Sequence, residues 1–351
     1  MFKAVAGYYK DNERLRLLVK IIAVWLISRA VMLLMVPVMN LIADEPHQWL
    51  YYMNPWDAEW YKGIVENGYQ PPKSSGMASW AFFPLYPLVC MAVRLVTMGS
   101  IDTYAVGMTV SNICIIIAVY YAVKYADIEL DMKKYNKKTV EDIIIFLMLA
   151  GPFAVYYGAM YTEALFILCV ILCFYNSARH NYMAAGIAAA MASATRIVGC
   201  MLVFVLITYM FMETCAECRD KHNSEMKDNK EAGIIDKCML TEEAGILIAG
   251  NISLASVIRT FIKNVIKDPK KLVAIMISPL GIFIYMNYLR YFCGDSWAFY
   301  HVQRAWRTQK MFPVIGVLFK SCTGQLSAAS GVKTLNGIIL GWLCVITLML
   351  Y

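Results

Sequence analysis

Long apolar runs alternate with short polar stretches along most of this chain. A helix needs about 20 mostly apolar residues to cross the hydrocarbon core of a bilayer. The pattern therefore predicts an all-α, polytopic integral membrane protein with about 8 transmembrane helices. The expected spans lie near residues 17–39, 104–123, 142–158, 164–178, 182–212, 272–289, 311–319 and 335–351, the run at 311–319 being the weakest.

The apolar segment 81–96 is short, contains Pro84 and Pro87, and ends near Arg94. These features favour an interfacial or re-entrant helix over a full crossing. Charge supports this choice, because cytoplasmic loops carry an excess of Lys and Arg. The lysine-rich segment 124–138 falls on the cytoplasmic side only if 81–96 does not cross. The N-terminus is then cytoplasmic, and residues 40–103 lie outside.

Thr195 and Arg196 interrupt the apolar stretch 182–212. One long helix with a buried arginine is one interpretation. An arginine at the centre of a bilayer costs at least about 2.5 kcal/mol on insertion scales. We therefore favour two short helices that meet at Arg196 near the outer face.

Composition agrees with a membrane protein. The chain is 60% hydrophobic and 16% charged, whereas soluble domains are about 25% charged. The net charge of +7 sits mainly in a few clusters. Nucleic-acid binding would need a basic groove, and none is predicted. We expect one membrane domain over 1–351, with a partly disordered cytosolic insert at 213–271 whose apolar piece, 244–258, lies on the membrane.

The eleven cysteines fall mostly inside apolar runs, where a thiol acts as a small hydrophobic group. Cys215 and Cys218, with His222 and Cys238 nearby, resemble a zinc site, but a second Cys-x-x-Cys pair is absent. Reduced thiols are the favoured interpretation. A divalent cation held by an acidic pair stays open, because one Asp-x-Glu is too little to predict it.

Unusual polar residues converge on the outer face under this topology. Ionisable residues at membrane depth mark functional sites by default. Such a residue would act as a general base with a pKa raised by burial, or it would contact a substrate. The candidates are Asp57 as catalytic residue and Glu59, Glu163, Arg196, His301, Gln303, Arg304 and Arg307 as substrate-binding residues.

Asp57 and Glu59 lie between large aromatic residues, in Trp56-Asp57-Ala58-Glu59-Trp60. Residues two apart do not share a helix face, so the two acids should have different roles. The alternative is an aromatic belt at the membrane interface. Glu163 has its own alternative as a first-turn acid that complements a helix dipole. Arg196 needs a partner, either a phosphate or Glu163.

An outer pocket with carboxylates and arginines suits sugar transfer from a polyprenyl phosphate. A carboxylate would deprotonate the acceptor hydroxyl, and arginines would stabilise the departing lipid phosphate. No Gly-rich phosphate loop is present, so no nucleotide is expected.

Two rival interpretations of the function remain. One is a transporter or flippase of lipid-linked sugar, which should show paired broken helices. The other is a non-catalytic membrane scaffold.

An ordered set of motifs resembles the PIG-V-type mannosyltransferase family, relatives of the enzyme that adds the second mannose to glycosylphosphatidylinositol. Each motif alone is weak, and their order over about 50–310 carries the resemblance. The motifs are Asn54-Pro55-Trp56-Asp57-Ala58-Glu59-Trp60-Tyr61, Ala81-Phe82-Phe83-Pro84-Leu85-Tyr86-Pro87, Tyr161-Thr162-Glu163-Ala164-Leu165-Phe166, Ala194-Thr195-Arg196, and Ala298-Phe299 with Gln303 and Trp306-Arg307.

The resemblance implies a C-type glycosyltransferase fold, a polyprenyl-phosphate mannose donor, a lipid or envelope-glycan acceptor, and inverting transfer with Asp57 as the base. The resemblance also maps motif positions onto Glu163, Arg196, Gln303 and Arg307. The insert at 213–271 departs from the family, and the C-terminus looks short for it. Short loops favour a bacterial plasma membrane, and a eukaryotic source would imply the endoplasmic reticulum.

Overall fold

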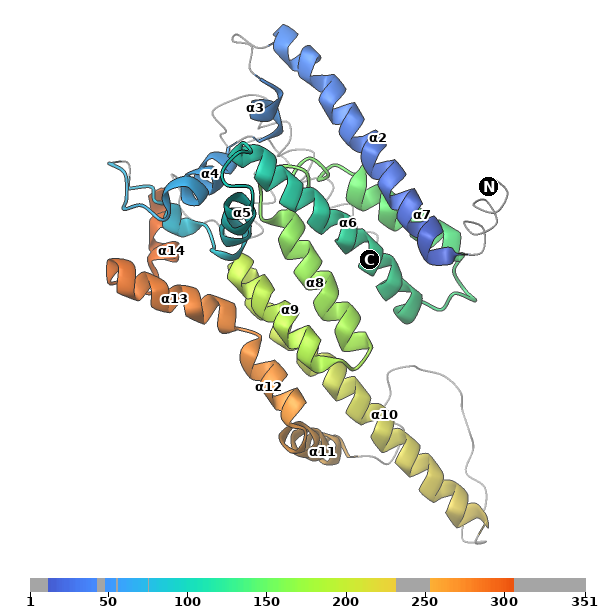
Figure 1. The fold of residues 1–351 in the computed structure, drawn as a ribbon. Helices are drawn as coiled ribbons and strands as arrows, with labels where there is room; N and C mark the ends of the chain where they lie inside the picture. Colours follow the sequence, from blue (N-terminus) through green and yellow to red (C-terminus); the bar gives the residue numbers. More distant parts are fainter. Residues whose placement is uncertain (1–11, 43–47, 55, 75, 232–252, 306–351) are drawn as a thin grey trace, which may run out of the picture.

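The computed structural model describes residues 12–42, 48–54, 56–74, 76–231 and 253–305. All regular elements within these ranges are helices, which confirms the all-α prediction. In chain order they are α2 (Glu13–Ile42), α3 (Trp49–Met53), α4 (Ala58–Asn67), η1 (Ser79–Ala81), α5 (Leu85–Val96), α6 (Thr103–Glu129), α7 (Lys137–Leu149), α8 (Glu163–Ala178), α9 (Tyr182–Thr195), η2 (Ile197–Met201), α10 (Leu202–Glu231), α11 (Leu254–Lys267), α12 (Pro269–Ile277), α13 (Leu280–Cys293), α14 (Ala298–His301) and η3 (Val302–Ala305), where η marks a 3-10 helix (Figure 1).

Three helical segments of the described chain are long and apolar enough to cross a membrane: Glu13–Val38, Thr103–Glu129 and Ile197–Ser224. The pair α12 and α13 would make a fourth span, bent by 43°. Ser278 and Pro279 lie at this bend, where proline removes a backbone donor and interrupts the helix. The predicted count of about 8 spans is not confirmed, and the segments 311–319 and 335–351 lie outside the described residues.

Three predicted spans differ from the helices that form. The segment expected at 142–158 ends earlier, with α7 stopping at Leu149, because Gly151 and Pro152 break the helix. The segment 272–289 is the bent pair α12 and α13. The break at Arg196 is present, but the helix after it is long, since α10 continues to Glu231. Glu, Lys and Arg are good helix formers, so the polar sequence after 213 extends the same helix.

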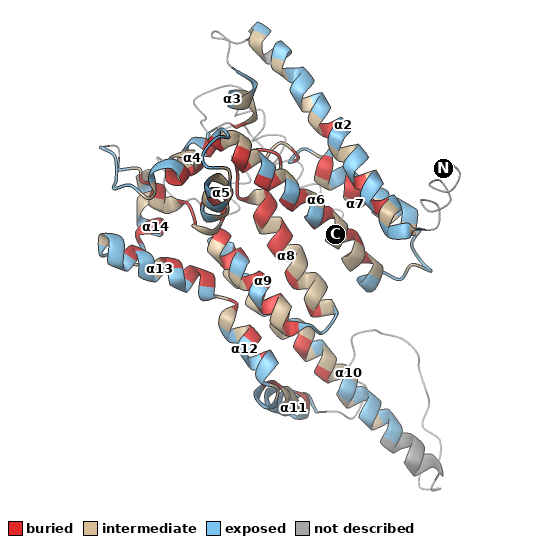
Figure 2. Ribbon diagram, viewed as in Figure 1, coloured by how far each residue is buried: buried red, intermediate tan, exposed pale blue. Residues whose placement is uncertain are grey.

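The core forms around α8, which packs between α6 and α9. Small residues on α9 let its neighbours approach closely, as in other packed membrane helices. Gly281 of α13 illustrates this, because a Cβ there would lie 2.3 Å from the carbonyl oxygen of Ala190. Figure 2 shows buried positions concentrated on α6, α8 and α9. Close backbone packing therefore holds the part of α9 that leads to the break at Arg196.

Helix α2 lies along the margin of the bundle, with most of its surface exposed (Figure 2). Its exposed side chains are large and apolar, for example Leu34 at 72% exposure, as expected of a lipid-facing helix. Lys20 pairs with Asp142 at 2.6 Å, and the Ser28 hydroxyl donates to the carbonyl of Leu149. The order of these contacts along both helices shows that α2 and α7 run in the same direction.

Helix α11 is amphipathic. Val257 and Val265 are buried, whereas a second apolar stripe is exposed on the helix. The stripe consists of Leu254, Ile258, Ile262 and Ile266. Such a stripe on a basic helix is typical of a helix that lies on a membrane surface. The predicted surface segment began at 244, and residues 244–252 lie outside the described ranges.

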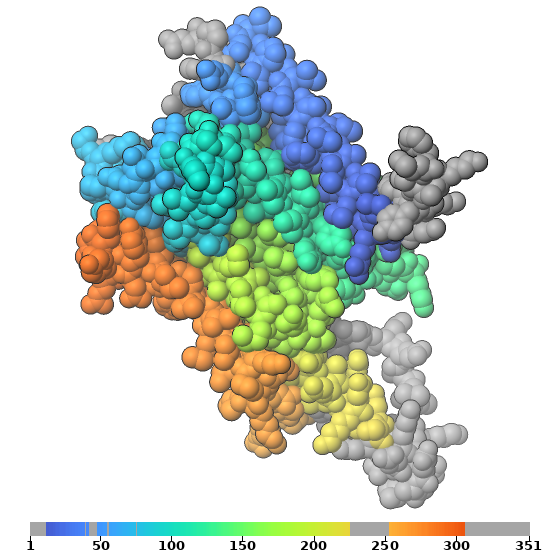
Figure 3. Space-filling model, in the orientation of Figure 1, coloured from blue at the N-terminus to red at the C-terminus, as the bar shows by residue number. Residues whose placement is uncertain are grey.

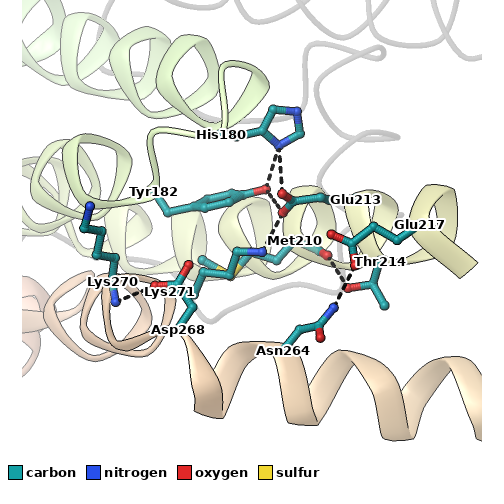
Figure 4. Close-up of polar contacts among 10 residues, drawn as sticks. All are labelled: His180, Tyr182, Met210, Glu213, Thr214, Glu217, Asn264, Asp268, Lys270 and Lys271. Carbon is teal, nitrogen blue, oxygen red and sulfur yellow. Dashed lines mark hydrogen bonds and ion pairs between the residues drawn. The ribbon is translucent and has the colours of Figure 1, made fainter.

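A cluster of polar contacts lies at one end of the bundle, centred on Glu213 of α10 (Figure 4). Lys271 Nζ lies 2.8 Å from the Glu213 carboxylate, and the Tyr182 hydroxyl donates to it at 2.8 Å. His180 lies 3.5 Å away on the other carboxylate oxygen. We call these four residues the Glu213 clamp. It joins the turn before α9 and the starts of α9 and α12 to the middle of α10.

Candidate functional site

A cleft of about 350 Å³ lies at the opposite end of the bundle from the Glu213 clamp. Helices α8 and α9, which have one end at the clamp, have their other ends here, at Glu163 and Thr195 (Figure 1). Polar and apolar side chains share the wall. The lining residues are Asp57, Tyr61, Ala81, Phe82, Phe83, Tyr161, Thr162, Glu163, Thr195, Arg196, Ile197, Val198 and Gln303.

Asp57 stands at the start of α4, and two long-range hydrogen bonds hold the loop before it. Asn54 is buried, and its side-chain oxygen accepts from the backbone N–H of Met160 at 2.7 Å. The backbone N–H of Asp57 donates to the hydroxyl of Tyr161 at 3.2 Å. The loop that carries Asp57 is thereby tied to the segment that leads into Glu163.

Trp56 adopts a left-handed backbone conformation, with φ of 49°. This conformation is rare for a bulky residue and persists only where the surroundings enforce it. The hydrogen bonds of Asn54 and Asp57 on either side supply that constraint. The strained residue directly precedes the candidate base, as is common in functional loops.

Glu163 and Arg196 form an ion pair inside the cleft. Arg196 Nη1 lies 2.8 Å from Glu163 Oε1. Arg196 has an extended backbone and separates α9 from η2, so its side chain leaves a helix break. Glu163 is the first residue of α8. A helix start and a helix break from different parts of the chain thus supply the two charges.

The environment of Asp57 raises its pKa. The carboxylate opens to the cleft, but protein surrounds much of it, and this partial desolvation is the main cause of the raised pKa. The negative charge of Glu163 raises the pKa further, while Arg196 lowers it. A carboxyl with a raised pKa is suited to general-base catalysis.

Aromatic residues form part of the cleft wall. The Phe82 ring stacks on Trp60 and meets Tyr61 edge-on, with centroids 5.7 Å and 5.1 Å apart. The hydroxyl of Tyr285, on α13, donates to the carbonyls of Trp80 and Phe82. Figure 3 shows the corresponding orange segment packed against the blue residues of this region. The late segment of the chain is therefore fastened to the cleft wall.

The structure brings four of the predicted site residues together in the cleft and places the others elsewhere. Asp57, Glu163, Arg196 and Gln303 line it. Glu59 instead accepts a hydrogen bond from the hydroxyl of Tyr104 on α6.

His301 contacts the carboxylate of Asp295 at 2.7 Å, away from the cleft wall. This hydrogen bond lowers the pKa of Asp295. Arg304 is exposed on η3 and is not part of the lining. Arg307 lies outside the described residues, so its predicted role is untested.

Besides Thr195, three hydroxyl-bearing residues of the cleft were not among the predicted site residues: Tyr61, Tyr161 and Thr162. Burial raises the pKa of both tyrosines, so their hydroxyls stay protonated at neutral pH. The signal was visible, because each stands within a motif that also holds an acid. Their orientation toward the cleft depends on contacts with distant residues, such as that between Tyr161 and Asp57.

Within the described ranges, no group of three or more His, Cys, Asp and Glu side chains is placed to share a metal ion. Cys215 and Cys218 are free thiols on α10. The fourth residue of the zinc alternative, Cys238, lies outside these ranges. The two cleft carboxylates differ, because Glu163 already pairs with Arg196.

A model of the family described as Mannosyltransferase (PIG-V) matches residues 14–232. The chain belongs to this family. The resemblance seen in the sequence motifs is thus confirmed, and the PIG-V family match covers α2 to α10, with Asp57, Glu163 and Arg196. Gln303 lies beyond it. No curated protein and no solved structure matches the chain. Membership of the PIG-V family and the long apolar helices together indicate a membrane mannosyltransferase.

Proposed function

We propose that this protein transfers mannose from a polyprenyl-phosphate donor to a hydroxyl of a lipid or envelope-glycan acceptor, at the outer or lumenal face of the membrane. One observation carries the proposal. The cleft places Asp57, whose pKa is raised, beside the ion pair of Glu163 and Arg196. Family membership supplies the sugar and the reaction class.

In the proposed reaction Asp57 is the general base. The acceptor hydroxyl gives its proton to the Asp57 carboxylate, and its oxygen attacks the anomeric carbon of the mannosyl group. The bond from that carbon to the phosphate oxygen breaks, and the polyprenyl phosphate leaves with the bonding electrons. A single displacement of this kind inverts the anomeric configuration. A positioned base contributes typically 10²- to 10⁴-fold to the rate.

Arg196 is the proposed partner of the leaving phosphate. Its guanidinium carries several N–H donors, and one nitrogen contacts Glu163. An arginine fork matches phosphate geometry, and developing negative charge in a cleft is stabilised by a preorganised cation. Glu163 would orient this cation, as a positioning residue. Gln303 and the hydroxyls of Tyr161 and Thr162 line the same cleft and would contact the sugar or acceptor.

The rival transporter interpretation required paired broken helices in two related halves. Membership of the PIG-V family does not favour it. A non-catalytic scaffold would leave the strained loop at Trp56 and the raised pKa of Asp57 without a role. The scaffold predicts that Asp57 is dispensable, and neither rival transfers mannose to an acceptor, so a transfer assay separates both from the proposed enzyme.

The test is transfer of radiolabelled mannose in proteoliposomes. The purified protein is supplied with polyprenyl-phosphate mannose and a lipid extract of the source membrane as acceptor. We expect transfer by the wild type and a loss of about 10²-fold or more in Asp57→Asn. The readout is radiolabelled mannose that has left the donor lipid and is recovered in an acceptor of different mobility.

A matched control is Glu66→Gln, which changes another acid of α4. The Glu66 carboxylate accepts from Thr103 at 2.7 Å and is not part of the cleft, so activity should persist. Glu59→Gln shows in addition whether the neighbouring acid contributes. Full activity in Asp57→Asn would contradict the base assignment. No transfer by the wild type from this donor would overturn the proposed donor class.

A further inference from the structure

A second crevice, of about 380 Å³, lies between α2, α3 and α6. Its wall is almost entirely apolar, and it opens where α2 and α6 have exposed side chains. Leu33 and Ile113, at 46% and 53% exposure, stand on this open side. The lining residues include Trp25, Leu33, Trp49, Met53, Ile113 and Ile116. An apolar crevice on the lipid-facing side of a membrane helix suits a hydrocarbon chain.

One charged side chain lies in this apolar wall, namely Arg29 of α2. Its Nη1 donates to the carbonyl of Ala154 at 2.9 Å. Its Nε and Nη2 are buried, and no acceptor among the described residues is within hydrogen-bond distance of them. Gly158 makes room for the guanidinium, because a Cβ there would lie 2.5 Å from Nη1.

Among the described residues, no carboxylate forms an ion pair with Arg29. The crevice lining contains no carboxylate. Its polar residues are already engaged: Asn112 accepts from the Trp25 indole at 2.7 Å and donates to the carbonyl of Met108, and the Thr109 hydroxyl donates to the carbonyl of Ala105. A charged group within a membrane span is costly unless it meets a partner. The crevice therefore offers an unneutralised cation beside an apolar channel.

We propose that this crevice binds an anionic lipid, with a phosphate oxygen on Arg29 and the hydrocarbon chain between α2 and α6. Arg29 lines the crevice, and its Nε and Nη2 are the donors left for a phosphate oxygen. Phosphate is the anion that an arginine fork binds best. A lipid supplies both the charge and the chain, whereas an acidic protein segment would leave the apolar wall unmatched.

The crevice adjoins the candidate active site through one short loop. Val155 and Gly158 line the crevice, and Tyr161, Thr162 and Glu163 line the cleft a few residues later. A lipid held by Arg29 therefore lies against the segment that carries the cleft residues. The site is separate from the cleft, and its existence does not depend on the proposed sugar transfer.

The test is photo-crosslinking in phosphatidylcholine nanodiscs with three diazirine-tagged probes: a polyprenyl phosphate, a phosphatidylglycerol and an uncharged polyprenol. Labelled residues are mapped by mass spectrometry. We expect the phosphate-bearing probes to label α2 and α6 at the crevice, about tenfold more than polyprenol does. The probe that labels more strongly tells whether the natural ligand is a polyprenyl lipid or a glycerophospholipid.

Arg29→Gln should lower this labelling about tenfold. The charge-matched control Arg290→Gln, at an exposed position of α13, should leave it unchanged. If Arg29→Gln does not fold, Ile113→Trp decides, because it keeps the arginine and narrows the crevice. Equal labelling by polyprenol, or labelling that neither variant lowers, would overturn the proposal. So would a wild-type crevice that no probe labels, which would mean that protein covers it.

Discussion

Arg196 Nη1 lies 2.8 Å from Glu163 Oε1, which joins two residues that are 33 positions apart in the chain. The pair sets the electrostatics around Asp57, because Glu163 raises the pKa of Asp57 and Arg196 lowers it. The two charges of this ion pair therefore shift the pKa of Asp57 in opposite directions. Removing either partner should change the pKa of Asp57 in a direction that is known beforehand.

The first prediction concerns the pH dependence of transfer. Activity requires deprotonated Asp57, so the acid limb of kcat/KM should lie above the ordinary pKa of aspartate, near 3.8. Glu163→Gln removes a like charge and should move the limb to lower pH. Arg196→Gln removes a cation and should move it to higher pH. Both variants should also lower kcat, so the profile is normalised to each maximum.

The opposite signs distinguish electrostatic coupling from general damage to the cleft. Gln303→Glu serves as a third variant, because it adds a negative charge to the same cleft and should move the limb upward. Shifts of the same sign in Glu163→Gln and Arg196→Gln would show that the limb reports some other group.

A second prediction concerns stability. Because the pKa of Asp57 is raised in the folded protein, its charged form favours unfolding, and this penalty grows as the pH rises through the folded pKa. Asp57→Asn should therefore raise the apparent Tm at neutral pH while abolishing transfer. The gain should fade toward pH 3.8, where Asp57 becomes protonated in both states.

Thermal unfolding of detergent-purified protein, followed by tryptophan fluorescence over a pH series, measures this effect. Glu66→Gln is again the matched control and should show no comparable gain. A lower Tm for Asp57→Asn at neutral pH would mean that the carboxylate makes stabilising contacts that outweigh its desolvation.

A third prediction concerns the Glu213 clamp (Figure 4). The side chain of Lys271 is 11% exposed and relies on Glu213 as its counter-charge. Glu213→Gln should destabilise the protein by about 1–3 kcal/mol, since it leaves a mostly buried ammonium unpaired but within reach of some water. The double variant Glu213→Gln with Lys271→Met should recover part of this loss.

Equilibrium unfolding in mixed micelles gives the free energies for this cycle. Arg219→Gln on the exposed part of α10 is the control for a charge change without a buried partner. The coupling would be refuted if the double variant were as unstable as the sum of the single variants. The acid limb of kcat/KM should not move, because the clamp is at the other end of the bundle.

A fourth prediction concerns which side of the membrane each end faces. The cleft end should lie outside and the clamp end in the cytoplasm. In a cysteine-free background, a cysteine at Asn67 of α4 should react with an impermeant maleimide in intact cells. A cysteine at Asp131, between α6 and α7, should react only after permeabilisation. Reaction of both in intact cells would contradict the charge-based topology.

Much of the architecture was readable from local patterns. The apolar runs predicted the long spans α2 and α6, and the interruption at Arg196 predicted the break between α9 and η2. These predictions succeeded because hydrophobicity and helix breaking act within a few residues. The span count was less predictable, since α7, α8 and α9 are short and the described part of the chain leaves two expected spans untested.

The roles of the two acids in the aromatic loop show where local reasoning stops. Their spacing predicted different faces and therefore different roles. It could not decide which acid would enter a cleft. Asp57 enters it, and Glu59 contacts Tyr104 of α6, because α4 packs on α6 with one particular rotation.

The sequence by itself determined the membrane character, the helix breaks and the family, since each depends on composition, short-range periodicity or ordered motifs. Only the tertiary structure decided which polar residues share the cleft, because the contacts that position them are long-range. Asn54 holds Met160 across 106 residues, and through that contact Asp57 comes to face Glu163 and Arg196. Such pairings follow from how helices pack, which no local pattern encodes.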